Sequence, residues 1–222
     1  IGVAVMVIII SAVILWILVK PEVETDKSIA VLPFKNDSGD SSNIYIANGL
    51  MDAVLNNLQK IKDLKVISRT SVEKYRNSNL TIPEIAKELN VTYFVEGSAQ
   101  KIDDNILLNI KLVDGKNDRH MWSEQYDRKL DDVFDIQREV ASKIAHQVEA
   151  NITPLEQQRL NEIPTRDMIA YEYFLKGLDL LQHANEENLN KAIPLFTKAI
   201  ERDENFARAY AAISMAYYYL DI

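Results

Sequence analysis

The region that most constrains the fold of this chain is a strictly alternating apolar pattern between residues 106 and 112. Apolar side chains stand at every second position: Ile106, Leu108, Ile110 and Leu112. This period of two predicts a strand with one buried face. Polar turns flank it at residues 103–105 and 114–118, and further strands are predicted over residues 91–102 and 119–128. Because short turns join antiparallel neighbours, the three strands are predicted to form an antiparallel meander.

The residues around this meander predict the rest of an α/β domain. Apolar runs at residues 28–34 and 64–68 indicate buried strands, and helical spacing indicates a helix over residues 44–61. Short helices are predicted over residues 71–76 and 81–89, the second capped by Thr81. After the meander, a long helix is predicted from Asp131 to about residue 150. The predicted fold class is therefore α/β, with a mixed-sheet domain over residues 28–152.

Beyond this domain, helical spacing replaces alternation. A helical linker is predicted over residues 153–165, followed by helices over residues 168–183, 188–202 and 206–220. The second of these has the small-large-small spacing of a tetratricopeptide repeat: Ala192, Phe196 and Ala199. Residues 166–222 are therefore predicted to be an α-helical tetratricopeptide repeat array. Since such arrays need about three repeats to be stable, we expect further repeats to follow Ile222.

The first nineteen residues contain nothing more polar than Ser11. At about 1.5 Å per residue, a helix of this length nearly covers the ~30 Å hydrocarbon core of a bilayer. We predict a transmembrane helix over residues 1–20 and a linker over residues 21–27. A signal peptide is disfavoured because a basic start and a small-residue cleavage site are lacking. The chain begins without Met, so we expect a further domain before Ile1.

The overall charge argues against nucleic-acid binding by this part of the protein. The chain has 25 Lys and Arg against 33 Asp and Glu, a net charge of −8, whereas binding to nucleic acid requires basic surfaces. The absence of Cys excludes disulfides, cysteine nucleophiles and thiolate metal sites.

No catalytic, cofactor-binding or metal-binding constellation is recognisable, and we predict neither enzyme activity nor a cofactor. The histidines lack metal-ligand spacing and are predicted to be structural or at the surface: His120, His146 and His183. Two aspartates in the first loop lack the distal glutamate of a calcium site: Asp37 and Asp40. Three more are predicted to cap the long helix and to compensate its dipole: Asp131, Asp132 and Asp135.

Aromatic residues are predicted to serve mainly in packing. Trp122 and Tyr126 share one strand face, where a core contact is favoured over stacking on a ligand. Gly97 within a strand indicates close packing by a helix, or a bulge. For the repeat tyrosines, packing between helices is the alternative to contact with a partner: Tyr171, Tyr217, Tyr218 and Tyr219. Packing is favoured for Tyr217, whereas Tyr218 and Tyr219 cannot all face inward together. The concave groove of the repeats is the predicted site for a protein or peptide partner.

Six blocks of the sequence, in this order, resemble the TolB amino-terminal-like (FlgO-like) domain: SIAVLPFKNDSGD, YIANGLMDAVLNNL, LKVISRTSVEKYR, IAKELNVTYFVEGSAQK, LLNIKLVDG and HMWSEQYDRKLDDVFDIQREVASKIA. The resemblance covers residues 28–152. It departs from the family at Asn48, where an acid is usual. In that family the domain commonly precedes tetratricopeptide repeats and follows a single transmembrane helix, as in bacterial membrane-bound regulators. A cytoplasmic DNA-binding domain or nucleotide cyclase then lies upstream.

The resemblance implies a non-enzymatic, extracytoplasmic sensory and protein-interaction module. It would belong to a single-pass protein of the bacterial inner membrane, with the module in the periplasm and a transcriptional regulator's DNA-binding domain upstream. The expected partners are proteins or peptides at the repeat groove and the lipid bilayer at residues 1–19, but not nucleic acid. Two alternatives stay open: the extracytoplasmic part of a membrane-bound adenylate or guanylate cyclase, and a structural envelope scaffold.

Overall fold

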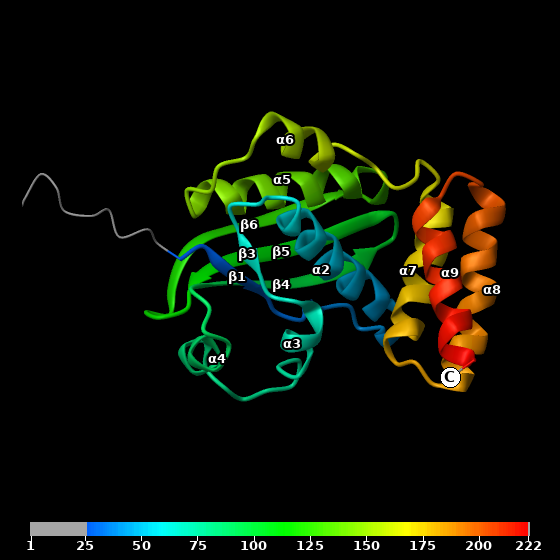
Figure 1. Cartoon of the computed structure of the whole chain (residues 1–222), viewed down its shortest axis with the longest axis horizontal. Coiled ribbons are helices and arrows are strands. Elements are labelled where there is room, and N and C mark those ends of the chain that lie inside the picture. Colours follow the sequence, from blue (N-terminus) through cyan, green and yellow to red (C-terminus); the bar gives the residue numbers. More distant parts are fainter. Residues whose placement is uncertain (1–25, 222) are drawn as a thin grey trace, which may run out of the picture.

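Six strands form one mixed sheet in the structure, a computed structural model that describes residues 26–221 (Figure 1). Their order is β3-β1-β4-β5-β6, and β2 pairs with β4. Strand β1 is parallel to β3 and β4, whereas β5 is antiparallel to β4 and β6, so the predicted meander is confirmed. The strands are β1 (Ser28–Val31), β2 (Lys35–Asn36), β3 (Lys65–Val66), β4 (Tyr93–Ile102), β5 (Asn105–Asp114) and β6 (Arg119–Lys129).

Two strands outside the meander are shorter than the sequence predicted. The run over residues 28–34 pairs as a strand only through Val31, because Pro33 has no N–H to donate to a neighbour. Leu32 still donates its N–H to the Val95 carbonyl, at 2.9 Å. The run over residues 64–68 provides only the two residues of β3, at the edge of the sheet.

Helices cover both faces of the sheet. Helices α2 and α5 lie on one face, with α6 beyond α5, and α3 and α4 lie on the opposite side (Figure 1). The helices are α2 (Ile44–Gln59), α3 (Arg69–Glu73), α4 (Ile82–Leu89), α5 (Val133–Gln147), α6 (Pro154–Leu160), α7 (Met168–Gln182), α8 (Glu186–Arg202) and α9 (Ala207–Leu220). Short 3-10 turns precede α2 and α5: η1 (Ser41–Asn43) and η2 (Leu130–Asp132).

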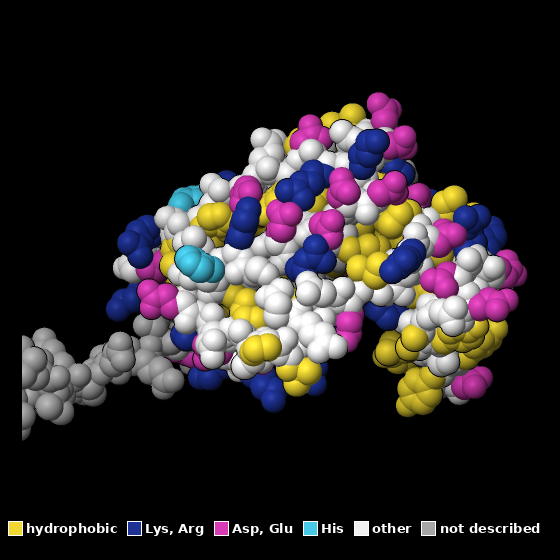
Figure 2. Space-filling view, turned by 90° about the horizontal axis from the view of Figure 1, so that it is seen from above, with side chains coloured by type: hydrophobic (Ala, Val, Ile, Leu, Met, Phe, Trp, Pro, Cys, Tyr) yellow, Lys and Arg dark blue, Asp and Glu magenta, His cyan; other side chains and the backbone are white. Residues whose placement is uncertain are grey.

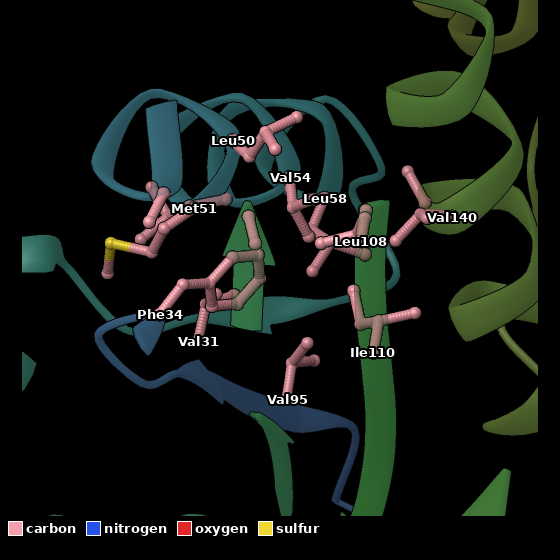
Figure 3. Close-up of a cluster of buried hydrophobic side chains, with 14 of the residues drawn as sticks. Val31, Phe34, Leu50, Met51, Val54, Leu58, Val95, Leu108, Ile110 and Val140 are labelled. Carbon is pink, nitrogen blue, oxygen red and sulfur yellow. The ribbon is translucent and has the colours of Figure 1, made fainter. Parts of the chain in front are cut away.

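The core lies between α2, α5 and the sheet. Figure 3 shows Val54 and Leu58 of α2 directed toward Leu108 of β5, with Val140 of α5 completing the contact; all four are fully buried. Gly97 is closely packed, since the Phe34 ring lies 2.7 Å from where a Cβ would stand, but Phe34 lies between β1 and β2 and not on a helix.

The helix starts agree with the sequence in part. Thr81 caps α4 in a capping box with Glu84, as predicted. At α5 the predicted start at Asp131 is a 3-10 turn instead, and Asp132 precedes the helix without a side-chain capping bond. Asp135 pairs with Arg138 at 2.5 Å. The aspartates therefore act there through their charge near the positive helix end.

Helices α7, α8 and α9 lie at one end of the molecule (Figure 1). Phe196 of α8 lies against Gly177 of α7, where a Cβ would stand 2.5 Å from the ring. Tyr171 is buried, but the prediction that Tyr217 packs between helices is wrong, because its side chain is 53% exposed. Helix α9 packs on α8 and α7 through Ala209, Ala212 and Ala216, and Tyr217, next to Ala216, is left exposed beside this face.

The fold class expected from the sequence needs one correction. Among the residues that the structure describes, no helix is both long and apolar enough to cross a membrane. The longest, α8, has 17 residues and carries charged side chains, whereas a membrane crossing takes about 20 apolar residues. The predicted span over residues 1–19 lies outside the described residues. The described fold is a mixed-sheet α/β body followed by helices.

Candidate functional site

The residues singled out in the sequence lie on separate elements. His120 is on β6, His146 is on α5 and His183 ends α7. Within residues 26–221, no group of His, Asp and Glu side chains comes together as a metal ion would require. In the first loop, the Asp40 carboxylate accepts hydrogen bonds from the N–H and the hydroxyl of Ser42 and so caps η1. Asp40 therefore holds local structure in place.

The structure instead brings residues together where α7 packs on α2 and α5. Leu175 of α7 fills the space beside Gly49 of α2, 2.7 Å from where a Cβ would stand. Tyr171 lies edge-on to Phe134, with ring centroids 4.7 Å apart. Gln137 of α5 donates a hydrogen bond to the Tyr171 hydroxyl at 3.1 Å. We call this contact the α2–α7 junction.

Asn48 lies at the centre of the junction and is almost fully buried. Its Nδ2 donates to Asp179 Oδ1 of α7 at 2.6 Å, and its Oδ1 accepts from Arg76 Nη2 at 2.9 Å. The amide therefore links a carboxylate on one side to a guanidinium on the other. A neutral amide can donate and accept at once, which an acid at this position could not do when ionised.

A second polar cluster lies one turn further along α2. The Asp52 carboxylate forms an ion pair with Arg69 of α3, and both side chains are largely buried. Arg69 Nη2 also donates to Gln182 Oε1 of α7 at 2.5 Å, and Gln182 Nε2 donates to Asp52 Oδ2 at 3.3 Å. Burial raises the pKa of Asp52, although Arg69 acts in the opposite direction. Three elements are thus tied together by one charged cluster.

The N-terminal part of α7 adds a third contact to the junction. The Tyr45 hydroxyl donates to Glu172 Oε1 at 2.8 Å, and burial together with this carboxylate raises the pKa of Tyr45. Burial opposes ionisation of Glu172, but hydrogen bonds from Lys176 and Tyr45 outweigh it and lower the pKa. A small cavity here holds only about 10 Å³, room for at most one water-sized group. The junction residues therefore bind one another and leave little room for a ligand. They hold α7 in a fixed position on the α/β body.

The sequence contains a signal for this junction on α2. Asn48 and Asp52 are polar, stand four residues apart and flank Gly49 on the apolar face of α2. Residues at this spacing share one helix face. Their partners could not be predicted, because Asp179 and Gln182 are 131 and 130 residues away in the chain.

A relative with a curated name matches most of the chain. It is "Putative adenylate cyclase 3" from Rhizobium meliloti (strain 1021), 32% identical over 195 residues. The match covers 88% of this chain and 33% of that protein. The chain thus spans about a third of the length of this relative.

Two solved structures are similar to parts of the chain, at low sequence identity and with TM-scores below 0.5. TolB from Acinetobacter baumannii is 18% identical, with a TM-score of 0.43, over 55% of this chain and 28% of that one. Lipoprotein GNA1162 from Neisseria meningitidis is 16% identical, with a TM-score of 0.40, over 46% of this chain and 80% of that one.

A family match covers more than half of the chain and the whole of the sheet. Residues 25–143 match the second domain of the HilA/YgeH-like transcriptional regulators. These residues include β1 to β6, all of α2 and most of α5, and so they contribute the α2 side of the α2–α7 junction. The chain belongs to the family of HilA/YgeH-like transcriptional regulators.

Proposed function

We propose that this chain is the non-enzymatic sensory and protein-interaction part of a one-component transcriptional regulator, with DNA binding carried by another part of the protein. Membership of a regulator family supports the regulatory role. The single observation that carries the interaction role is the outer face of α9. Its large side chains are exposed although they are apolar or aromatic: Tyr210, Met215, Tyr217, Tyr218 and Tyr219. Aromatic residues and Met are enriched in protein interfaces.

We further propose that α7, α8 and α9 form tetratricopeptide repeats that bind a protein or peptide partner. The contact of Phe196 with Gly177 supports this, because a small residue on one helix and a large one on the next let the helices approach closely. The α2–α7 junction would hold this array rigidly on the family domain. A change in the position of the repeats on binding would then be transmitted to the family domain and the rest of the regulator.

A test compares transcripts in cells that produce the whole protein with and without Tyr217→Ala. Loss of a partner contact should change the regulated transcripts while the protein level stays the same. Leu155→Ala is the matched control, because Leu155 on α6 is 56% exposed against 53% for Tyr217. Unchanged transcripts with Tyr217→Ala would contradict the proposal.

The alternative function is the regulatory part of a cyclase, and the name of the relative from Rhizobium meliloti favours it. Cyclic AMP measured in the same cells separates the two proposals. A change in the cyclic AMP level of cells with Tyr217→Ala would support the alternative that the chain regulates a cyclase. The periplasmic location stays a prediction, which fractionation of cells that produce the whole protein can test.

A further inference from the structure

A hollow of about 710 Å³ opens between the α/β body and the start of α9. Its walls come from the second half of α2, the first turn of α5, residues 160–164 and residues 205–208. Figure 2 views the molecule from the side of α6. Residues 160–164, at the end of α6 and in the connection to α7, form one wall of the hollow. The volume falls within the range of about 300–1,000 Å³ that is typical of ligand sites.

Two basic side chains line this hollow, Lys60 and Arg208. Lys60 Nζ donates to the Arg159 carbonyl at 2.9 Å, and the Arg208 guanidinium lies 5.2 Å from the centroid of the Phe174 ring. Both contacts fix the position of a charge without neutralising it. Within residues 26–221, neither side chain forms an ion pair with a carboxylate.

The two cations also act on each other. Burial lowers the pKa of Lys60, Glu162 opposes this effect, and the charge of Arg208 adds to it. Glu162 is the one acid among the residues described as lining the hollow. The hollow therefore keeps an excess of positive charge in a protein whose net charge is −8. An anion placed between Lys60 and Arg208 would relieve their repulsion.

The remaining walls suit an extended peptide. Four amide side chains line the hollow: Asn56, Asn57, Gln137 and Asn205. An amide can both donate to a peptide carbonyl and accept from a peptide N–H. Phe134, Ile163 and Pro164 supply apolar surface beside them. Most ligand sites combine these two features, apolar walls with a few polar groups that fix orientation.

We propose that this hollow binds an acidic peptide segment of a partner protein, with a carboxylate held between Lys60 and Arg208. Charge complementarity selects this occupant over a neutral or basic one. The site lies apart from the outer face of α9 and does not depend on the proposed regulatory function. Because its walls come from both sides of the α2–α7 junction, the peptide would bridge the α/β body and the helices.

The test measures binding of a fluorescein-labelled peptide of alternating Glu and Leu to the full chain by fluorescence anisotropy. A matched peptide with Gln in place of Glu serves as the neutral probe. We expect the Glu peptide to bind at least about tenfold more tightly, since one charge pair at a partly buried site contributes on the order of a factor of ten. Arg208→Gln and Lys60→Gln should each weaken its binding about five- to tenfold.

Lys198→Gln is the matched control, because Lys198 is an exposed cation 5.5 Å from the Tyr173 ring centroid and lies outside the hollow. Binding of the Glu peptide should be unchanged by this substitution. Arg208→Lys, which keeps the charge, should retain most of the affinity. Circular dichroism of each variant checks that it is folded, because Arg208 is exposed but its guanidinium also contacts the buried Phe174 ring.

Three results would overturn the proposal. Equal affinity for the Glu and Gln peptides would show that charge does not select the ligand. Equal weakening by Lys198→Gln and Arg208→Gln would show that the peptide binds by overall charge. Full displacement of the peptide by millimolar inorganic phosphate would assign the hollow to a small anion. None of these outcomes bears on transcripts, so the proposed function is tested separately.

Discussion

Gly177 lies within α7, where the ring of Phe196 occupies the space that a side chain would fill. Alanine favours a helix over glycine by about 1 kcal/mol, so Gly177→Ala would stabilise α7 if no other atom stood nearby. The ring carbon, 2.5 Å from the new Cβ, reverses this expectation. We predict that Gly177→Ala lowers the free energy of unfolding by about 1–3 kcal/mol, measured by urea denaturation.

Ser214→Ala on α9 provides the control. Ser214 stands 37 residues after Gly177, is exposed, and donates its hydroxyl to the Tyr210 carbonyl in its own helix. Its replacement should change stability by no more than about 0.5 kcal/mol. A Gly177→Ala protein as stable as the wild type would mean that Phe196 moves aside without cost.

Asp167 precedes α7 and allows a pH-dependent prediction. Hydrogen bonds from Arg202, and from the N–H of Ala170, lower the pKa of Asp167. A carboxyl whose pKa is lower in the folded state stabilises the protein above its unfolded pKa of about 3.9, and this stability is lost as the pH falls through the folded value.

Asp167→Asn keeps a capping side chain but removes the ion pair with Arg202. We expect it to cost about 0.5–1 kcal/mol of stability at pH 7, as for partly exposed pairs. This difference should shrink toward zero between about pH 4 and pH 2. Denaturant unfolding of both proteins across this range measures it. A constant difference would show that the charge of Asp167 is not what stabilises α7.

Among elements, α3 is tied to α2 and α7 by the Asp52–Arg69 pair. Arg69→Ala leaves a largely buried carboxylate without its partner, so we predict a loss of about 2 kcal/mol or more. Removing Asp52 as well also removes the charge that lacks a partner. The double variant Asp52→Ala with Arg69→Ala should therefore be less destabilised than the sum of the single ones, by about 1–3 kcal/mol. Additive losses would contradict a coupled pair.

The elements also explain what the sequence could predict. The meander was predictable because alternation in β5 and the turns beside it are local signals. The early end of β1 depends on a single proline, which is visible in the sequence. The predicted strand nevertheless extended past this proline. The junction was not predicted, since Asn48 meets Asp179 only through tertiary packing. Tyr217 was mispredicted because a repeat pattern does not say which helix face is covered.

At the scale of the whole molecule, one buried core runs from Ile29 to Ala216. It crosses residues 153–165, where the sequence predicts a boundary between two domains. A fragment of residues 27–163 keeps the sheet, α2 and α5, so we predict that it unfolds cooperatively. It also exposes Gly49 and Leu50, which α7 covers in the whole chain. Its urea midpoint should therefore be lower than that of residues 27–222, and equal midpoints would contradict this.

Helix α9 lies at the outer end of this core and contacts mainly α8 and α7. Its inner face is built largely from small side chains, Ala209, Ala212 and Ala216, which bury little apolar area. Its tyrosines lie outside, with Tyr218 64% exposed. Amides in elements with few buried contacts exchange through local opening, which requires less free energy than global unfolding.

We therefore predict that amide hydrogens of residues 207–220 exchange with deuterium faster than those of β5, which is paired on both sides and buried along one face. Hydrogen exchange followed by mass spectrometry at low protein concentration measures this. A tenfold dilution is the control, because self-association through the tyrosine face would slow exchange only in the concentrated sample. Equal protection of α9 and β5 at both concentrations would contradict this prediction. It would show that the core stabilises α9 as much as the sheet, so that α9 needs no partner to become ordered.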